Sequence, residues 1–251
     1  MTPPTPGRIK NETVSPMKTL RLREGKERAA LRRHPWIYDN AIAKGSGDSG
    51  ETVRVESATG QFLGWAAFSP SSKIRARIWS FDEAERVDDA FFARRLHTAI
   101  AARARMDINS DGVRLVHGEA DGLPGLIVDR YGETLVAQFL SSGTERWKPA
   151  IADALCSATG VGRLYERSDS GVRALEGLQP HSGWLRQPAG DAGHTDAWAA
   201  QCQANHERAW TSDVNEHFRA RMYMARDSVN AACSDGCDGA EIVEALRSAL
   251  P

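Results

Sequence analysis

Polar and apolar residues alternate through much of the segment that follows residue 17. The alternation is clearest in residues 19–22, 52–57 and 73–81, and an apolar, aromatic run covers residues 61–68. A period of two is typical of β-strands, and glycine-rich turns separate these segments. The pattern predicts a small β-barrel over residues 18–82. A short basic helix or turn is expected at residues 25–33, followed by a strand at residues 36–38.

A second pattern begins after the acidic linker at residues 82–89. Phe92, Leu96, Ala99 and Ile100 recur with helical spacing and predict an amphipathic helix over residues 90–106. A second helix is expected at residues 145–157. Strands are expected at residues 113–116, 126–129, 134–140 and 162–166, and a glycine turn joins the middle two into a hairpin. Residues 83–180 are therefore predicted to form an α+β domain.

The two ends of the chain lack such periodicity. Residues 1–17 are predicted to be a disordered leader, in which Met17 is a candidate for the natural start. Residues 181–251 are rich in Ala, Asp and Ser, and we expect a poorly ordered tail with one helix at residues 239–250. The predicted fold class is α+β, with a small β pseudo-barrel, an α+β domain and this tail.

Charge is distributed unevenly along the chain. Residues 1–105 carry 19 lysines and arginines against 12 acidic residues, whereas the remainder carries 13 against 21. The basic part suggests an anionic partner such as nucleic acid, although the two parts could also simply attract each other. No apolar run approaches the length of a membrane span, and no membrane partner is expected. Four cysteines suit a reducing cytoplasm.

The candidate chemistry is concentrated in the basic segment before Pro35. Arginines there can neutralise phosphates, and the aromatic rings that follow can stack on unpaired bases, a combination typical of RNA-binding surfaces. A strand at residues 73–81 would place three more cations on one face. The predicted RNA-binding residues are Arg28, Arg32, Arg33, His34, Trp36, Lys73, Arg75 and Arg77. The alternative is a solvated basic face beside ordinary core aromatics, with Trp36 in the core.

Other motifs predict no catalytic or metal chemistry. Glu119 and Asp121 could act as an acid–base pair, but the surrounding glycines favour a tight turn in which both carboxylates accept backbone N–H groups. Cys233 and Cys237 lack a second pair of ligands for a zinc site. No Gly-x-Gly-x-x-Gly loop follows a predicted strand, so no nucleotide cofactor is expected to bind this chain.

Five motifs in order resemble one family, the bacterial 23S rRNA (cytosine-C5)-methyltransferases, which use S-adenosylmethionine (SAM). The motifs lie at residues 21–28, 31–38, 68–77, 118–130 and 166–177, and the likeness covers about residues 18–186. The resemblance implies an RNA-binding PUA domain, then an α+β middle domain, then a Rossmann-like catalytic domain. It also implies 23S rRNA as the partner; it does not indicate an oligomeric state.

The sequence departs from the family after about Gln187. The resemblance calls for a Gly-rich cofactor loop, an Asp-Pro-Pro stretch and a catalytic cysteine between two serines, and none of these strings occurs. We expect a frameshifted or truncated form that binds RNA without catalysing methylation, and we assign no catalytic residue. The alternatives are a functional methyltransferase with an atypical C-terminal region and a non-enzymatic interaction protein that uses its tail.

Overall fold

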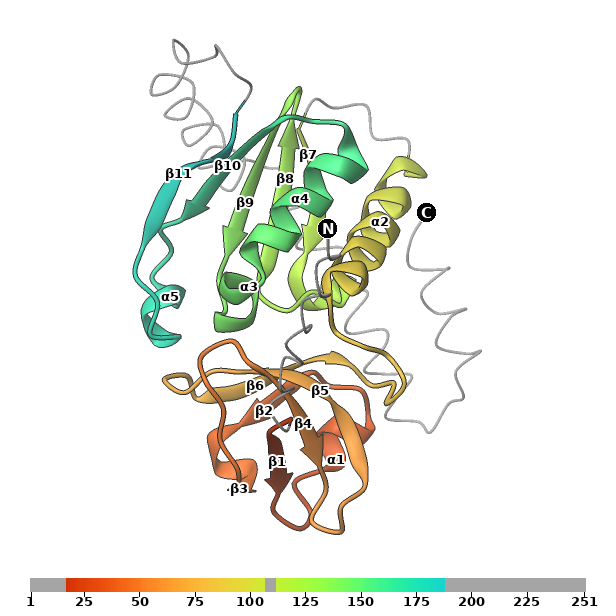
Figure 1. Ribbon diagram of the computed structural model, residues 1–251, viewed down its shortest axis with the longest axis vertical. Coiled ribbons are helices and arrows are strands. Elements are labelled where there is room, and N and C mark those ends of the chain that lie inside the picture. Colours follow the sequence, from red (N-terminus) through yellow and green to blue (C-terminus); the bar gives the residue numbers. More distant parts are fainter. Residues whose placement is uncertain (1–16, 107–111, 188–251) are drawn as a thin grey trace, which may run out of the picture. The chain divides into compact units, whose positions relative to one another are not determined.

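The computed structural model describes residues 17–106 and 112–187, all within one compact unit that ends at Ala189. The first part contains six strands: β1 (Thr19–Leu22), β2 (Trp36–Tyr38), β3 (Ile42–Lys44), β4 (Thr52–Glu56), β5 (Phe62–Phe68) and β6 (Ile74–Ser80). They form one sheet in the order β2-β6-β5-β4-β1-β3 (Figure 1). The helix α1 (Arg28–Leu31) and a 3-10 turn, η1 (Asp39–Ala41), complete this part. Every strand predicted here is present; only β3 was not predicted.

The connection between β2 and β3 forces this sheet to curl. These two strands lie at opposite edges of the sheet, yet only the three residues of η1 separate them in the chain. Six strands laid flat would hold the edges about 24 Å apart, at about 4.8 Å per step. The backbone from Tyr38 to Ile42 can span at most about 14 Å. The sheet therefore bends its edges toward each other, as the predicted pseudo-barrel requires.

The second sheet has five strands in the order β11-β10-β9-β8-β7. They are β7 (Gly112–His117), β8 (Leu126–Tyr131), β9 (Thr134–Phe139), β10 (Arg163–Ser168) and β11 (His181–Arg186), and only β9 and β10 pair in parallel. The helices α2 (Asp89–Ala104) and α4 (Lys148–Thr159) pack against each other beside this sheet (Figure 1). The short elements are η2 (Gly118–Asp121), α3 (Ser142–Arg146) and α5 (Val172–Leu175).

Local sequence explains where the helices begin. The Asp88 side chain accepts the N–H of Phe91 and caps α2. The second predicted helix, at residues 145–157, is divided at Trp147 into α3 and α4. Ser141 and Thr144 form a reciprocal capping box that starts α3 early, and Pro149 stands in the first turn of α4. The prediction missed both of these start signals.

The two sheets share a hydrophobic core. Ala67 of β5 and Trp79 of β6 are 3 % and 2 % exposed and belong to the cluster that α2, α4 and the second sheet form. Trp79 packs edge-on against Phe92 of α2, with ring centroids 5.3 Å apart. Gly143 of α3 lies so close that an added Cβ would stand 2.4 Å from the Ala67 side chain. The sequence boundary near residue 82 is therefore not a break in packing.

The predicted boundary at residue 180 is wrong. β11 pairs antiparallel with β10 along its whole length, so residues 181–186 complete the second sheet rather than begin a tail. The prediction failed because Gly183 and the polar ends of this strand obscure its alternation. The leader at residues 1–16, the predicted helix at residues 239–250, Cys233 and Cys237 lie outside the described residues. None of the helices in the described ranges has the length and apolar character to span a membrane.

Candidate RNA interface

The basic segment ends in one turn of helix whose cationic side chains stay at the surface. The exposed members of the predicted set here are Arg28, Arg32, Arg33 and His34. Backbone bonds of 2.9 Å from the Arg33 N–H to Ala30 and from the His34 N–H to Ala29 close the helix. Pro35 follows at once and prevents continuation. These groups are therefore free of the core and able to reach a phosphate.

Arg33 occupies an unusual backbone conformation. Its φ of 64° makes it the one non-glycine residue with positive φ in the described ranges. The position directly after a helix commonly carries glycine, because a Cβ there costs roughly 1–2 kcal/mol. The Arg33 guanidinium lies 5.3 Å from the centroid of the Phe81 ring. An arginine kept at a strained position and held over an aromatic ring is a candidate for a functional side chain.

Two substitutions of Arg33 separate backbone strain from side-chain function. Both Arg33→Gly and Arg33→Ala remove the guanidinium and its contact with Phe81. Only glycine relieves the positive φ, so we expect Arg33→Gly to unfold with a free energy about 1 kcal/mol higher than Arg33→Ala. Urea titration measures this difference. Equal stability of the two variants would mean that the backbone at this position is not strained.

Trp36 lies at the rim of the first sheet and is half-buried. Its ring meets His34 edge-on at a centroid distance of 5.5 Å, and its Nε1–H donates to Glu119 Oε1 at 2.8 Å. The core cluster of this sheet does not include it. The alternative of a core tryptophan is therefore wrong, and the ring remains available for contact with a ligand.

The three predicted cations of β6 and its entry do not share one environment. Lys73 is exposed, and Arg75 is half-buried, with its guanidinium donating to the carbonyls of Ser69 and Pro70. Arg77 is buried and pairs with Glu176 at 2.7 Å. Alternation predicted one shared face for the three side chains, but the Arg77 guanidinium is buried against Glu176 in the turn after α5. Arg77 is thus not part of an exposed RNA surface, and its prediction is corrected.

Glu176 is the centre of a buried polar network. It accepts hydrogen bonds from Arg77 Nη1, from the Ser69 hydroxyl at 2.7 Å and from the Ser142 N–H at 3.3 Å. Burial alone would raise the pKa of this carboxyl, but the Arg77 charge and the serine hydroxyls outweigh it and lower the pKa. Glu176 therefore stays ionised and links β6 to the turn after α5.

The loop at residues 118–125 is a structural turn, as predicted, but only one of its two carboxylates accepts a backbone N–H from the described residues. Asp121 accepts the His117 N–H at 2.6 Å and pairs through both oxygens with Arg103. Gly122 adopts a φ of 68°, which explains a glycine there. Glu119 points elsewhere, to Trp36. The two carboxylates thus have separate partners, and the acid–base pair is not formed.

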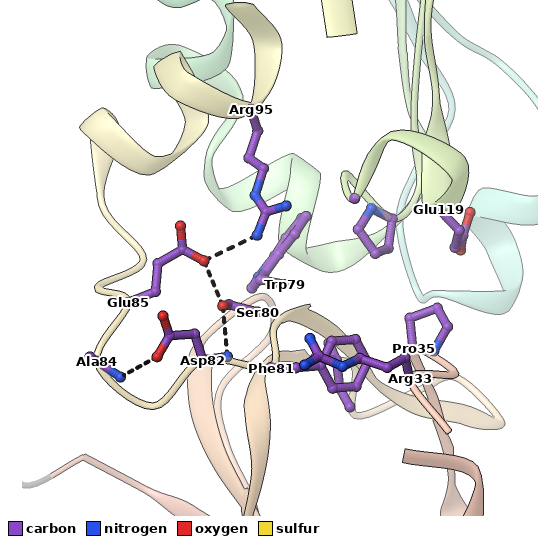
Figure 2. A pocket seen from close by; sticks show the side chains of 13 residues that line it. Arg33, Pro35, Trp79, Ser80, Phe81, Asp82, Ala84, Glu85, Arg95 and Glu119 are labelled. Carbon is purple, nitrogen blue, oxygen red and sulfur yellow. Dashed lines mark hydrogen bonds and ion pairs between the residues drawn. The ribbon is translucent and has the colours of Figure 1, made fainter. Parts of the chain in front are cut away.

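A cavity of about 550 Å³ lies beside Arg33 and Glu119 (Figure 2). Side chains from β6, α2 and the residue 118–125 loop line it, including Arg33, Trp79, Phe81, Glu85, Arg95 and Glu119. Glu85 accepts from Ser80 at 2.6 Å and from Arg95 at 3.0 Å. The sequence does not reveal this site, because nothing in the local pattern brings residues 81–95 beside Glu119. The only available signal was the aromatic Phe81 at the end of a basic strand.

The described residues do not fit a SAM site. Such a site needs the crevice beyond the carboxyl end of a parallel strand, together with a close-approach glycine loop. Here β9 is the parallel strand followed by a helix, and the space beyond it is filled: Gly143 packs on Ala67 and Trp79. Ser142 is already bonded to Glu176. Within the described ranges, no three His, Cys, Asp or Glu side chains group as metal ligands would.

Comparison with known proteins places this geometry in context. Residues 20–81 match the sequence model of a family described as a PUA-like domain. The proteins called ribosomal RNA large subunit methyltransferase I are similar in sequence. The one from Citrobacter koseri is 45 % identical over 165 residues, 64 % of this chain and 41 % of that protein. The one from Pseudoalteromonas translucida is 43 % identical over 173 residues, 66 % of this chain and 44 % of that protein. The chain spans about half the length of the curated relatives it matches.

The likeness extends beyond the described residues. The relative from Aliivibrio fischeri is 38 % identical over 220 residues and covers 86 % of this chain and 54 % of that protein. The alignment leaves out 14 % of this chain, which is fewer residues than the segment from Gln187 to Pro251 contains. The alignment therefore includes part of that segment. It thus continues past the predicted end of the likeness near Gln187, whereas the alignments with the Citrobacter koseri and Pseudoalteromonas translucida proteins cover only 64 % and 66 % of the chain.

Solved structures share the fold. A candidate SAM-dependent methyltransferase from Streptococcus mutans superposes with a TM-score of 0.58 at 19 % identity, over 69 % of this chain and 44 % of that chain. A candidate methyltransferase solved in complex with SAH gives a TM-score of 0.57 at 18 % identity, over 70 % of this chain and 44 % of that chain. At such identity the likeness establishes the fold alone.

Proposed function

We propose that residues 17–187 form the RNA-binding part of a SAM-dependent methyltransferase that acts on cytosine C5 of 23S rRNA. The observation that carries this proposal is the exposed cationic turn after α1, with Arg33 in a strained conformation beside the half-buried Trp36. It lies on the part of the chain that matches a PUA-like domain. The names of the similar proteins supply the substrate class.

The proposed RNA surface consists of Arg28, Arg32, Arg33, His34, Trp36, Lys73 and Arg75. Four of its cationic or ionisable side chains come from residues 28–34. From there they can contact neighbouring phosphates of one RNA strand. Phosphate contacts of this kind provide affinity and register, while the half-buried ring provides a stacking surface. A role on rRNA would place the chain in the cytoplasm, which agrees with its cysteine content.

We further propose that this 251-residue chain does not transfer a methyl group by itself. The supporting observation is the filled space beyond β9. SAM and the transfer chemistry are proposed for the portion of the relatives that the chain does not span. A functional enzyme with an atypical C-terminal region remains the second candidate, because the Aliivibrio fischeri alignment enters the segment after Gln187.

The full chain with a fluorescent hairpin from 23S rRNA tests the first part of the proposal. We expect saturable binding whose logarithmic affinity falls linearly with logarithmic salt concentration between about 50 and 200 mM. A DNA hairpin of the same sequence is the matched control and should bind more weakly, because it lacks the 2′-hydroxyl and the A-form shape. No RNA binding at the lowest salt would contradict the proposal.

Isothermal titration with SAM tests the second part. We expect no saturable heat with the chain alone. Micromolar binding would contradict the assignment of the cofactor to the unspanned portion and would favour the second candidate. It would leave the RNA-binding role intact.

A further inference from the structure

We propose that the cavity beside Arg33 receives one unpaired nucleobase that carries an exocyclic amino group, such as cytosine. This inference rests on the RNA-binding role proposed above and adds what that surface recognises. The cavity lies between β6, the start of the following linker, α2 and the turn that carries Glu119 (Figure 2). It is separate from the space beyond β9.

The size and walls of the cavity suit a flat ring. Its volume of about 550 Å³ falls within the roughly 300–1,000 Å³ of small-ligand sites. Phe81 and the guanidinium above it provide a planar cationic and aromatic wall, and Pro35 and Pro124 are among the other lining residues. Stacking of a base on such a wall adds to the affinity without selecting one base over another.

The charges that line the cavity disfavour a phosphate as its occupant. Three lining carboxylates, Asp82, Glu85 and Glu119, face two arginines, and one of these, Arg95, is paired with Glu85 at 3.0 Å. Burial acts to raise the pKa of Glu85, but the Ser80 hydrogen bond and the Arg95 charge prevail and lower it, so this carboxyl remains ionised. The net negative lining favours a neutral ligand that donates hydrogen bonds.

The acceptor atoms of the cavity indicate an amino group. The Trp36 Nε1–H donates a hydrogen bond to Glu119 Oε1 and so orients the carboxylate. The other oxygen, Oε2, has no hydrogen-bond partner among the described residues. Asp82 accepts the Ala84 N–H through Oδ1 only. In Figure 2, Glu119 stands on the side of the Arg33–Phe81 stack, opposite the Glu85–Arg95 pair. Carboxylates accept from the cytosine N4 amino group, whereas uracil presents the O4 acceptor in its place.

The cationic side chains lie outside, where the backbone of an extruded nucleotide would run. Arg33 belongs to both regions, because it lines the cavity and ends the exposed basic turn. Arg32 precedes it in that turn and is exposed. A base inside a negative cavity and phosphates on a positive rim match the charge pattern of a single nucleotide.

Three RNA hairpins of one stem sequence test the inference with the full chain. One is fully paired, one carries a single bulged cytosine, and one carries a bulged uracil. We expect the bulged cytosine to bind roughly tenfold more tightly than the paired hairpin, as one stacked and hydrogen-bonded base allows. The hairpin with the bulged uracil should show a clearly smaller increase in affinity over the paired hairpin. Fluorescence anisotropy at constant salt measures all three affinities.

Two variants link this preference to the cavity. Glu119→Gln keeps an oxygen for Trp36 but adds a donor amide, so the affinity ratio of bulged cytosine to bulged uracil should fall toward one. Ala84→Phe enlarges an exposed lining residue and should reduce the gain from either bulge. The matched control is Glu133→Gln, whose side chain is 91 % exposed in the β8–β9 turn and should keep the wild-type ratio.

The outcomes separate the two proposals. Binding of all three hairpins with equal affinity, or a ratio that survives Glu119→Gln, would overturn the cavity proposal and leave the RNA-binding role standing. Failure to bind any hairpin would overturn the RNA-binding role and the cavity proposal with it. Circular dichroism of each variant confirms that a changed ratio does not come from unfolding.

Discussion

Arg77→Ala is expected to lower the free energy of unfolding by about 3–5 kcal/mol, because it strands the charge of Glu176 inside the molecule. The Glu176 side chain is 1 % exposed and that of Arg77 9 %, so water cannot replace the lost partner. The contacts with serines would remain but supply no positive charge. Urea unfolding followed by tryptophan fluorescence measures the change.

Arg75→Ala is the matched control for this prediction. Arg75 lies two residues earlier on the same strand, is half-buried, and donates only to backbone carbonyls. We expect a loss of about 1 kcal/mol or less, as for one ordinary hydrogen bond. If the two variants lost equal free energy of unfolding, the Arg77–Glu176 ion pair would contribute no more to stability than an ordinary hydrogen bond.

The pH dependence provides a second check on the same pair. The folded protein holds the pKa of Glu176 below its ordinary value of 4.5. This group therefore contributes stability that is complete above that value and is lost as the pH falls through the lowered pKa. In Arg77→Ala the Arg77 charge no longer opposes the effect of burial, so the pKa of Glu176 rises and its protonation removes the stranded charge. The stability difference between variant and wild type should consequently narrow as the pH falls, starting at the higher pKa of the variant.

Arg32→Ala/Arg33→Ala is expected to weaken RNA binding and to flatten its salt dependence by roughly one to two units. Each neutralised phosphate contributes a log–log slope of about −0.7 to −0.9, and the double variant removes two exposed guanidinium groups. Anisotropy titrations with the 23S rRNA hairpin at several salt concentrations measure both quantities.

The control for this double variant separates binding from folding. Circular dichroism and urea unfolding should show a folded protein, since both side chains lie outside the core clusters of the described residues. An unchanged affinity and slope in a folded variant would identify the basic turn as a solvated face. The RNA site would then have to lie elsewhere.

Periodicity along the chain predicted most of the strands, because alternation reports which face of a strand is buried. It could not predict what covers the other face. Lys73, Arg75 and Arg77 follow one alternating pattern, yet only Arg77 is buried, by its pairing with Glu176 in the turn after α5. The missed β11 has the same origin: its place is determined by pairing with β10, and its own residues carry little apolar signal.

The candidate site was predicted only in its local part. The cationic turn before Pro35 is contiguous in sequence, so composition alone revealed it. The cavity joins Arg33, Phe81, Arg95 and Glu119 from four separate segments. Glu119 was interpreted as part of a turn, and its bond to Trp36 depends on two elements 83 residues apart meeting in space. Such a meeting is a property of tertiary packing, which no local pattern encodes.

The position of Trp79 couples the folding of the two sheets. Its backbone belongs to the first sheet, while its ring fills the core of the second. Neither sheet can lose its order without exposing apolar surface of the other, so their folding is linked. A ligand that binds the native state stabilises everything that unfolds together with its site. RNA held at the cationic turn would therefore also protect the core that α2 and α4 form with the second sheet.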